Sequence, residues 1–115
     1  MKGCELCTPL DVVFESDFAY VRYDSNSLAR GHVIVVPKRH VADFFDMSGA
    51  EQSSVIALLN RAHKMMREKY RPDGYNIGVN VGAAAGQSRM HVHVHLIPRY
   101  AGDPHEGKGV RAIFR

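Results

Sequence analysis

Short apolar segments separated by polar turns fill the first third of the chain, and this pattern predicts strands. Val12–Phe14 and Phe18–Tyr23 are rich in β-branched and aromatic residues, and a short polar stretch between them fits a tight turn. His32–Val36 is a third apolar segment of the same kind, and it ends at Pro37. We therefore expect three strands with short connections in this part of the chain.

The middle of the chain has a helical pattern instead. Apolar side chains recur at every third or fourth position from Val55 to Tyr70, which gives a helix one apolar face. Ser48 and Glu51 have the spacing of a capping box, in which the two side chains satisfy free backbone N–H groups at the start of a helix. We therefore expect a helix that begins after Ser48 and ends before Pro72.

Two further apolar segments, Tyr75–Val81 and His91–Ile97, flank a loop of small residues at Gly82–Ser88. These two strands can pair as a hairpin across that loop. Together with the earlier elements, they predict an antiparallel sheet with a helix on one face, which is the α+β class. No repeat or linker divides the chain, so we expect one domain over residues 1–115, with a loosely structured tail from Tyr100 to Arg115.

The composition says more about the binding partners of the protein than about its fold. Fifteen lysines and arginines against twelve acidic residues give a net charge of +3, and the basic residues are scattered. Such mild positive charge is compatible with an anionic ligand but does not indicate a nucleic-acid partner. No apolar stretch approaches the length of a membrane span, and the first residues lack the apolar core of a signal peptide. We therefore expect a cytoplasmic protein with no membrane partner.

Three histidines occupy alternate positions of the last predicted strand. His91, His93 and His95 should share one face of the strand, with apolar residues on the other. Neighbours on that face are about 7 Å apart, so three histidines on one strand can hardly complete a tetrahedral metal shell. A metal alone therefore does not account for the row. Partly exposed histidines without a role are the simplest alternative, but a row of three beside a glycine-rich loop argues against it.

The loop before this strand has the composition of an anion cradle. Small residues over Gly82–Ser88 let backbone N–H groups approach an anion closely, and Gln87 and Ser88 add side-chain donors. A plain turn is the alternative interpretation. Imidazoles beside a possible phosphate cradle indicate phosphoryl chemistry with histidine as the nucleophile.

At this point the sequence resembles the histidine triad (HIT) family, in four blocks that follow the family's order. The blocks are Gly31–His40, Asn80–Gly82, Gly86–Ser88 and His91–Leu96. Leu96–Asp103 is more similar to the dinucleoside-polyphosphate hydrolases of the family than to its phosphoramidase branch. The chain lacks the Trp-Pro-Pro-Gly ending of that branch and contains no tryptophan.

The resemblance implies a fold and an activity. The fold is a five-stranded antiparallel sheet with one long and one short helix, and two copies join their sheets into one in a homodimer. The activity is hydrolysis or nucleotidyl transfer at the α-phosphate of dinucleoside polyphosphates, through a nucleotidyl-histidine intermediate and without a catalytic cofactor. A purine-nucleoside phosphoramidase and a non-catalytic nucleotide-binding zinc protein are the alternatives.

The resemblance also implies roles for individual residues. His93 resembles the family's nucleophile, and the backbone carbonyl of His91 would take the proton on Nδ1 so that Nε2 can attack. His95 and His32 match the positions beside the α-phosphate, where a protonated His95 would stabilise charge in the transition state. The nucleotide-binding positions of the family match Asp24, which would hold the ribose, and Asn80, Gly86, Gln87 and Ser88.

The two cysteines of the chain, Cys4 and Cys7, have the spacing of a zinc knuckle. Some members of the family pair such cysteines with two histidines that match His40 and His91. The resemblance therefore implies a structural zinc ion held by these four residues. Two reduced cysteines at a frayed terminus are the competing interpretation.

Three residues depart from the family pattern. Ser27 stands where the family usually has proline, and Arg89 and Met90 replace a more common small or apolar pair. Arg89 either contacts a distal phosphate or reaches into solvent. These differences affect the choice of substrate more than the type of reaction.

Overall fold

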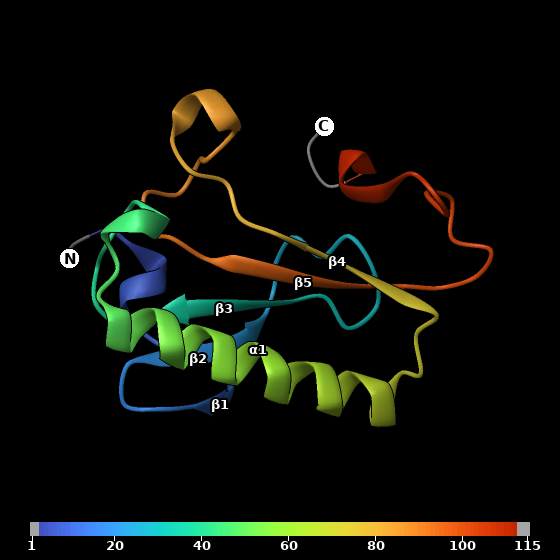
Figure 1. Ribbon diagram of the computed structural model, residues 1–115, viewed down its shortest axis with the longest axis horizontal. Helices are drawn as coiled ribbons and strands as arrows, with labels where there is room; N and C mark the ends of the chain where they lie inside the picture. Colours follow the sequence, from blue (N-terminus) through green and yellow to red (C-terminus); the bar gives the residue numbers. More distant parts are fainter. Residues whose placement is uncertain (1–2, 113–115) are drawn as a thin grey trace.

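The computed structural model describes residues 3–112 and contains one antiparallel sheet with a long helix on one face (Figure 1). The spatial order of the five strands is β1-β2-β3-β5-β4. Their bounds, with that of the helix, are β1 Val12–Glu15, β2 Ala19–Tyr23, β3 Val33–Pro37, α1 Gly49–Lys69, β4 Gly74–Gly78 and β5 Val94–Arg99. The predicted fold class is confirmed, and β4 and β5 form the predicted hairpin.

The last strand differs from its predicted bounds at both ends. β5 begins at Val94 rather than His91, and it continues through Pro98 to Arg99. Pro98 pairs with Tyr75 of β4 on one side, while the pairing with β3 has already stopped. Asp73 N donates to Arg99 O across 2.8 Å, so the backbone of Pro98, one residue earlier, faces the β3 side. Because β3 does not reach that far, the missing N–H of proline leaves no ladder bond unmade.

Local sequence signals account well for α1. Glu51 N donates to Ser48 Oγ at 3.1 Å, and Ser48 N donates to Glu51 Oε1 at 2.8 Å, which is the predicted capping box. Hydrogen bonds from Arg39 hold the pKa of Glu51 at about 2. The remaining helical segments of residues 3–112 are 3₁₀ turns of three or four residues, so the predicted short helix takes that form. They are Glu5–Cys7, Phe44–Asp46, Ala83–Ala85 and Gly109–Ala112.

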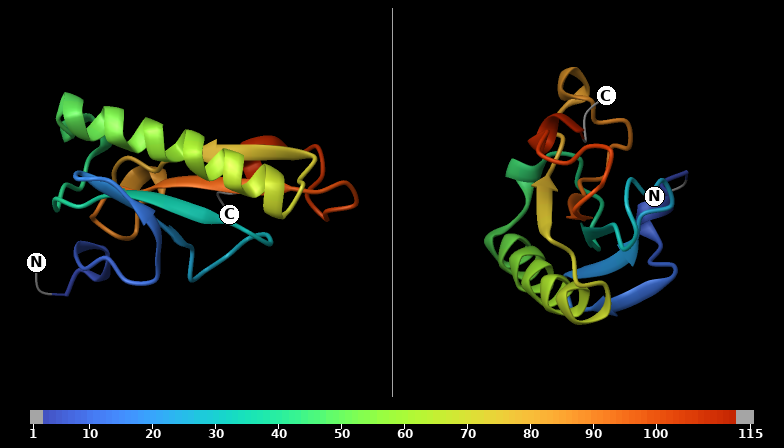
Figure 2. Two further views of the ribbon diagram at one scale, coloured as in Figure 1. Left: turned by 90° about the horizontal axis from the view of Figure 1, so that it is seen from below. Right: turned by 90° about the vertical axis from the view of Figure 1, so that its right-hand side faces the viewer.

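Each face of the sheet carries a buried apolar cluster. The apolar face of α1 packs on one face, where its buried side chains meet valines of β2, β3 and the segment leading into β5. Leu6 packs on the other face with Tyr20, Ile34 and Val36. Figure 2 shows the N-terminal segment on the side of the sheet opposite α1. Tyr20 donates from its hydroxyl to Leu6 O at 2.6 Å, and this contact pins the N-terminal segment and its cysteines against the sheet. No helix among the described residues combines the length and the apolar character that a membrane crossing requires.

Gly31, two residues before β3, lets Tyr70 at the C-terminal end of α1 pack closely against the chain. Its φ is +91°, and a Cβ there would lie 2.9 Å from Cδ2 of Tyr70. A side chain would therefore meet both backbone strain and a steric clash. Glycine at this position allows the chain to turn directly into His32.

Candidate functional site

One cavity of about 290 Å³ brings together all eight residues to which the sequence assigned catalytic or nucleotide-binding roles. Asp24 follows β2 and His32 precedes β3, and Asp24 N donates to His32 O at 3.0 Å. His95 lies on β5 opposite Ile34 of β3. The other members come from the segment between β4 and β5. They are His93, Asn80, Gly86, Gln87 and Ser88.

His93 has its tautomer set by the backbone. Its Nδ1 lies 2.9 Å from the carbonyl oxygen of His91, and because a carbonyl can only accept, Nδ1 must carry the proton. Nε2 is then left with a free lone pair, as predicted. Burial lowers the pKa of His93 below 6.5, against the opposing effect of the bond to His91, and the positive charge of Arg89 lowers it further. His93 is therefore a neutral imidazole at pH 7.

A chain of hydrogen bonds sets the tautomers of the other two histidines. Leu28 N donates to Nδ1 of His32 at 3.0 Å, so the proton of His32 lies on Nε2. That Nε2 is 2.9 Å from Nδ1 of His95 and donates to it. His95 therefore keeps its own proton on Nε2 as the donor that it can offer to a ligand.

The charge state of His95 differs from the expectation. Burial lowers the pKa of His95 and of His32 to about 4, so both are neutral at pH 7 in the free protein. The suggested protonated His95 is therefore wrong for the free site. A carboxylate lies nearby, but desolvation of the two rings outweighs its effect on their pKa values.

That carboxylate, Asp24, approaches both rings. Its Oδ2 lies 3.4 Å from Nε2 of His32 and 3.5 Å from Nδ1 of His95, an arrangement close enough to hold a metal ion. However, Nδ1 of His32 already accepts from Leu28 N, and Nε2 of a neutral ring then carries the proton. A metal ion at Nε2 would require an imidazolate, so the geometry favours a hydrogen-bonded relay here.

Gln87 supports the loop with its side chain. Its Oε1 accepts from Gly82 N at 2.8 Å, and its Nε2 donates to Ala42 O at 2.7 Å and to Arg89 O at 3.1 Å. Both amide protons are thus engaged, and the side chain is buried. A nucleotide contact from this amide, as predicted, would compete with these bonds. The sequence could not show this, because Ala42 is distant along the chain.

Asn26 and Leu28 line the cavity without a role in the sequence interpretation, and Arg89, for which that interpretation left a phosphate contact or solvent open, lines it too. Asn26 N donates to Asp24 Oδ1 at 3.1 Å, and Leu28 acts through its backbone N–H. No side-chain signal could identify such backbone donors. Arg89 lies beside the site, with Nη2 at 3.7 Å from Asp24 Oδ1.

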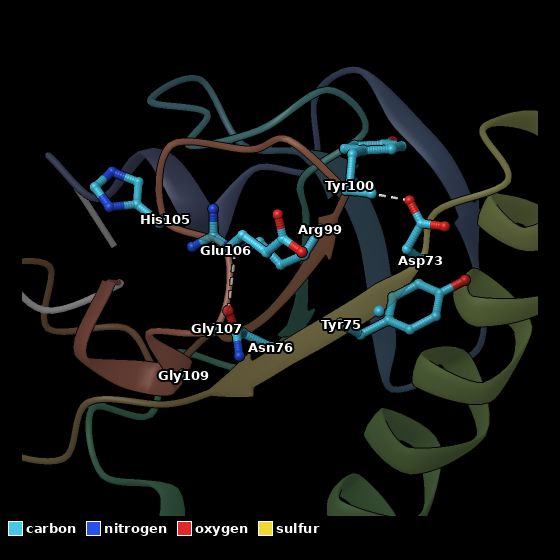
Figure 3. Close-up of a pocket in the computed structure, with 11 residues that line it drawn as sticks. Asp73, Tyr75, Asn76, Arg99, Tyr100, His105, Glu106, Gly107 and Gly109 are labelled. Carbon is cyan, nitrogen blue, oxygen red and sulfur yellow. Dashed lines mark hydrogen bonds between the residues drawn. The ribbon is translucent and has the colours of Figure 1, made fainter.

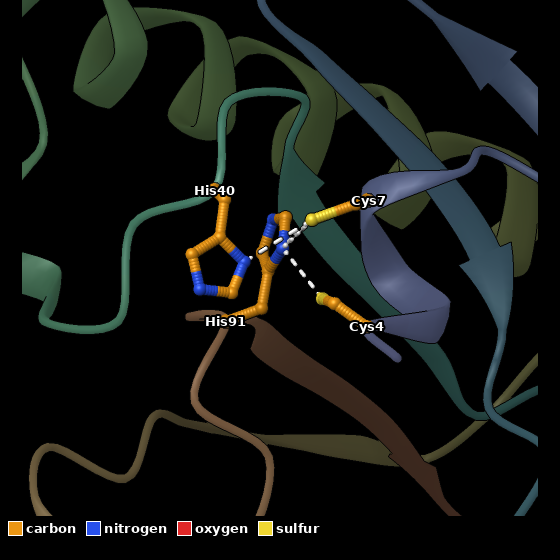
Figure 4. Close-up of side chains that lie close together, drawn as sticks. All are labelled: Cys4, Cys7, His40 and His91. Atoms are coloured by element: carbon orange, nitrogen blue, oxygen red, sulfur yellow. Dashed lines mark hydrogen bonds between the residues drawn. The ribbon is translucent and has the colours of Figure 1, made fainter. Parts of the chain in front are cut away.

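The two cysteines and two histidines of the predicted zinc site converge from three separate segments (Figure 4). Sγ of Cys4 lies 3.3 Å from Nδ1 of His91, and Sγ of Cys7 lies 3.1 Å from Nδ1 of His40. The four candidate ligand atoms lie within 4.8 Å of one another. Separations of this size are those of neighbouring ligands on one tetrahedral ion.

The protonation of His91 also suits a metal ligand. Nε2 of His91 donates to Pro37 O at 2.7 Å, so Nδ1 has the free lone pair and faces the two sulfur atoms. Burial lowers the pKa of His91, which favours the neutral ring that metal binding requires. Fixing one ring nitrogen by a backbone carbonyl is the usual support of a metal-bound histidine. These residues therefore fit a zinc ion.

A separate cavity of about 430 Å³ lies between the start of β4, the end of β5 and the C-terminal tail (Figure 3). Arg99 lines it and donates from Nε to Asn76 Oδ1 at 2.9 Å, while its Nη1 lies 3.4 Å from Asp103 Oδ2. None of the predicted site residues lines this cavity. The Arg99 of the hydrolase-like segment thus anchors the tail to the sheet.

Comparison with known proteins agrees with this geometry. A family model described as HIT domain matches residues 6–102. AP-4-A phosphorylase of Mycobacterium tuberculosis is 39% identical over 74 residues, which are 64% of this chain and 38% of that protein. Bis(5'-adenosyl)-triphosphatase of Saccharomyces cerevisiae is 32% identical over 90 residues, which are 77% of this chain and 44% of the yeast protein. The chain thus spans less than half the length of either relative.

A solved structure has the same fold. The structure of a Zn-bound histidine triad family protein from Mycobacterium smegmatis matches with a TM-score of 0.80 at 31% sequence identity. The match covers 89% of this chain and 78% of that one. Because the family model spans most of the chain and the fold agrees with it, the protein belongs to the HIT domain family.

Proposed function

We propose that this protein cleaves dinucleoside polyphosphates at the α-phosphate, with His93 as the nucleophile. The observation that carries the proposal is the hydrogen bond from His93 Nδ1 to His91 O, which leaves Nε2 as a neutral nucleophile in the site cavity. Two relatives are named for reactions of diadenosine polyphosphates, which supports this class of substrate.

The first step forms one bond and breaks another. Nε2 of His93 attacks the α-phosphorus, and the bond from phosphorus to the bridging oxygen breaks, so the remaining nucleotide leaves with its electron pair. Nε2–H of His95 and the backbone N–H of Ser88 can donate to the non-bridging oxygens, whereas the N–H groups of Gly86 and Gln87 already donate to Ala83 O and Gly82 O within the loop. Asp24 is then the candidate for the ribose hydroxyls and Asn80 and Ser88 for the phosphates, while Gly86 allows a close approach because it has no side chain.

The second step releases the nucleotide from His93. Water attacks the phosphorus of the nucleotidyl-histidine, the P–N bond breaks, and Nε2 regains its lone pair. Inorganic phosphate as the acceptor would make the enzyme a phosphorylase, the name that the mycobacterial relative has. We propose hydrolysis, and product analysis with and without added phosphate distinguishes the two outcomes.

Trapping the intermediate tests the mechanism. The protein is mixed with diadenosine tetraphosphate labelled in the adenosine, quenched within milliseconds to seconds, and digested for mass spectrometry. We expect an acid-labile adenylyl group on the peptide that contains His93 and none in the His93→Gly variant. An active enzyme whose label lies on another residue, or never lies on the protein, would contradict the proposal.

A substrate panel tests the alternatives. Diadenosine polyphosphates are compared with an adenosine 5'-phosphoramidate under the same conditions. Faster turnover of the phosphoramidate would make the protein a phosphoramidase of the same family. Binding without turnover of either substrate would support the non-catalytic alternative.

We further propose that Cys4, Cys7, His40 and His91 hold a structural zinc ion. The convergence of their ligand atoms and the Zn-bound relative support this. Zinc would supply a cross-link between the N-terminal segment, the segment after β3 and the segment that leads into His93. The site reaction above uses no atom of this cluster except the carbonyl of His91.

The assembly and the location of the protein stay predictions. A homodimer that joins two sheets would use one of the two edge strands, β1 or β4; on β4 the side chain of Ile77 is 53% exposed. Light scattering of the purified protein tests this, and a monomer would contradict it. The single domain over residues 1–115 and the cytoplasmic location likewise await direct measurement.

A further inference from the structure

Arg89 lies at the junction of two cavities. It lines the site cavity that contains His93 and also a second cavity of about 580 Å³ beside the N-terminal cysteines. Ser88 is the other residue that lines both. A chain of phosphates that extends from His93 across Ser88 would therefore pass the guanidinium of Arg89.

Two carboxylates hold Arg89 in this position. Nη1 forms an ion pair with Glu5 Oε1 at 2.5 Å, and Nη2 lies 3.7 Å from Asp24 Oδ1. The side chain of Glu5 is 57% exposed, whereas that of Asp24 is 4% exposed. Exposed ion pairs are weak and exchange readily, so the guanidinium can release Glu5 for a stronger anionic partner.

A polyphosphate bound in the site cavity needs a positively charged partner. Among the described residues that line the site cavity, Arg89 carries the only permanent positive charge, since the three histidines there are neutral at pH 7. Asp24 contributes a buried negative charge to the same cavity. A polyphosphate brings several further negative charges, which favour a guanidinium that can bind oxygen atoms in pairs.

We propose that Arg89 is a specificity-determining residue that binds the phosphates beyond the α-phosphate and exchanges Glu5 for their oxygens. This proposal rests on the proposed function for the position of the α-phosphate at His93. Arg89 would thereby favour substrates with a polyphosphate leaving group over substrates with a single phosphate.

A purely structural role for Arg89 makes a different prediction. If Arg89 served only to tie the loop to the N-terminal segment through Glu5, removing either partner of the pair would have the same effect. Glu5→Gln breaks the ion pair and leaves the guanidinium in place, so it is the matched control for Arg89→Ala. Arg89→Lys keeps the charge without the paired donors.

Isothermal titration calorimetry with ATP and AMP as probes tests the proposal without requiring turnover. We expect Arg89→Ala to weaken ATP binding about ten- to a hundredfold, the usual effect of losing hydrogen bonds to a charged group. AMP binding should change less than about twofold, because AMP has no phosphate beyond the α-position. Arg89→Lys should lie between the wild-type protein and Arg89→Ala, and Glu5→Gln should bind ATP as tightly as the wild-type protein or more tightly.

Several results would overturn the proposal. Equal losses for ATP and AMP, an unchanged ATP affinity, or a Glu5→Gln variant that loses as much as Arg89→Ala would each do so. If diadenosine tetraphosphate is hydrolysed but the ATP-to-AMP ratio does not depend on Arg89, this inference alone fails. If it is not hydrolysed, the proposed function fails, and the ATP and AMP affinities still decide the role of Arg89. Wild-type protein that binds ATP no more tightly than AMP would also overturn the inference about Arg89.

Discussion

His91 and His93 are joined by a hydrogen bond from the ring of one to the backbone of the other. Nδ1 of His93 donates to the carbonyl oxygen of His91 at 2.9 Å, while the ring of His91 faces the two cysteines. One residue therefore belongs to the candidate zinc cluster through its side chain and orients the candidate nucleophile through its backbone. This arrangement places the two sites in contact without sharing a side chain.

Replacing His93 by glycine should abolish turnover of diadenosine tetraphosphate. We expect kcat to fall at least about 10³-fold, because the covalent route is lost with the nucleophile. Steady-state kinetics measures this, and AMP affinity should stay within a few-fold of the wild-type value. His63→Ala, on α1 and away from the cavity, is the matched control. A His93→Gly variant with full turnover would contradict the assignment of His93 as the nucleophile.

If His32 relays a hydrogen bond to His95, two substitutions of His32 should have opposite effects on activity and on stability. His32→Gln places an amide donor near the position of Nε2 and keeps the bond to His95, but it leaves Leu28 N without an acceptor. His32→Asn keeps an acceptor near Nδ1 and loses the donor. We expect the glutamine variant to be less stable by about 1–3 kcal/mol yet more active than the asparagine variant. Urea unfolding and kcat measure the two effects, and the reverse order of activities would refute the relay.

The acid limb of the pH profile should lie below the ordinary pKa of imidazole. Burial lowers the pKa of His93, so the neutral nucleophile persists as the pH falls to 6.5 and is protonated only at lower pH. We therefore expect kcat/KM to be constant above about pH 7 and to fall to half its value below the reference pKa of about 6.5. Diadenosine tetraphosphate suits the measurement because its bridging phosphates do not titrate in this range. A midpoint at or above 6.5 would contradict the assignment.

Removing zinc should lower the thermal stability of the protein more than it lowers the turnover rate. We expect chelation to reduce Tm by an amount on the order of 10 °C, because metal binding is linked to folding. Cys4→Ser should show a similar Tm that no longer responds to chelator. Elemental analysis should find one zinc per chain in the wild-type protein. A wild-type Tm that is unaffected by chelation would count against the structural site.

The close approach at Gly31 should make alanine costly there. Gly31→Ala combines a φ of +91° with a Cβ 2.9 Å from the ring of Tyr70. We expect a loss of about 1–3 kcal/mol in the free energy of unfolding. Gly102→Ala is the matched control, because its φ is +86° and no atom lies within 4 Å of the added Cβ. Equal losses in the two variants would show that the contact with Tyr70 contributes nothing.

Features with a local cause were predictable. The capping box of Ser48 and Glu51 depends on residues three apart, and the structure contains it. The alternation before and along β5 also holds, since Val92, Val94 and Leu96 lie in the core and the histidines on the other side line the two sites. The sequence predicted that this strand ends before Pro98. It continues to Arg99 because β3 stops earlier, so no ladder bond needs the N–H that proline lacks.

The chemistry of the histidines depends on groups that only folding brings near them. The proton positions of His32 and His91 are set by Leu28 N and Pro37 O, and backbone groups look the same at every position of a sequence. The pKa values of about 4 for His32 and His95 come from burial, which follows from packing.

The sequence by itself therefore determined which chemical groups the protein has and which of them share a strand face, because these follow from residue type and short spacing. Only the tertiary structure decided that Arg89 lies between Glu5 and Asp24, and that Gln87 supports its loop. Such contacts join segments that are far apart along the chain, and their partners are fixed when the sheet, helix and N-terminal segment pack together.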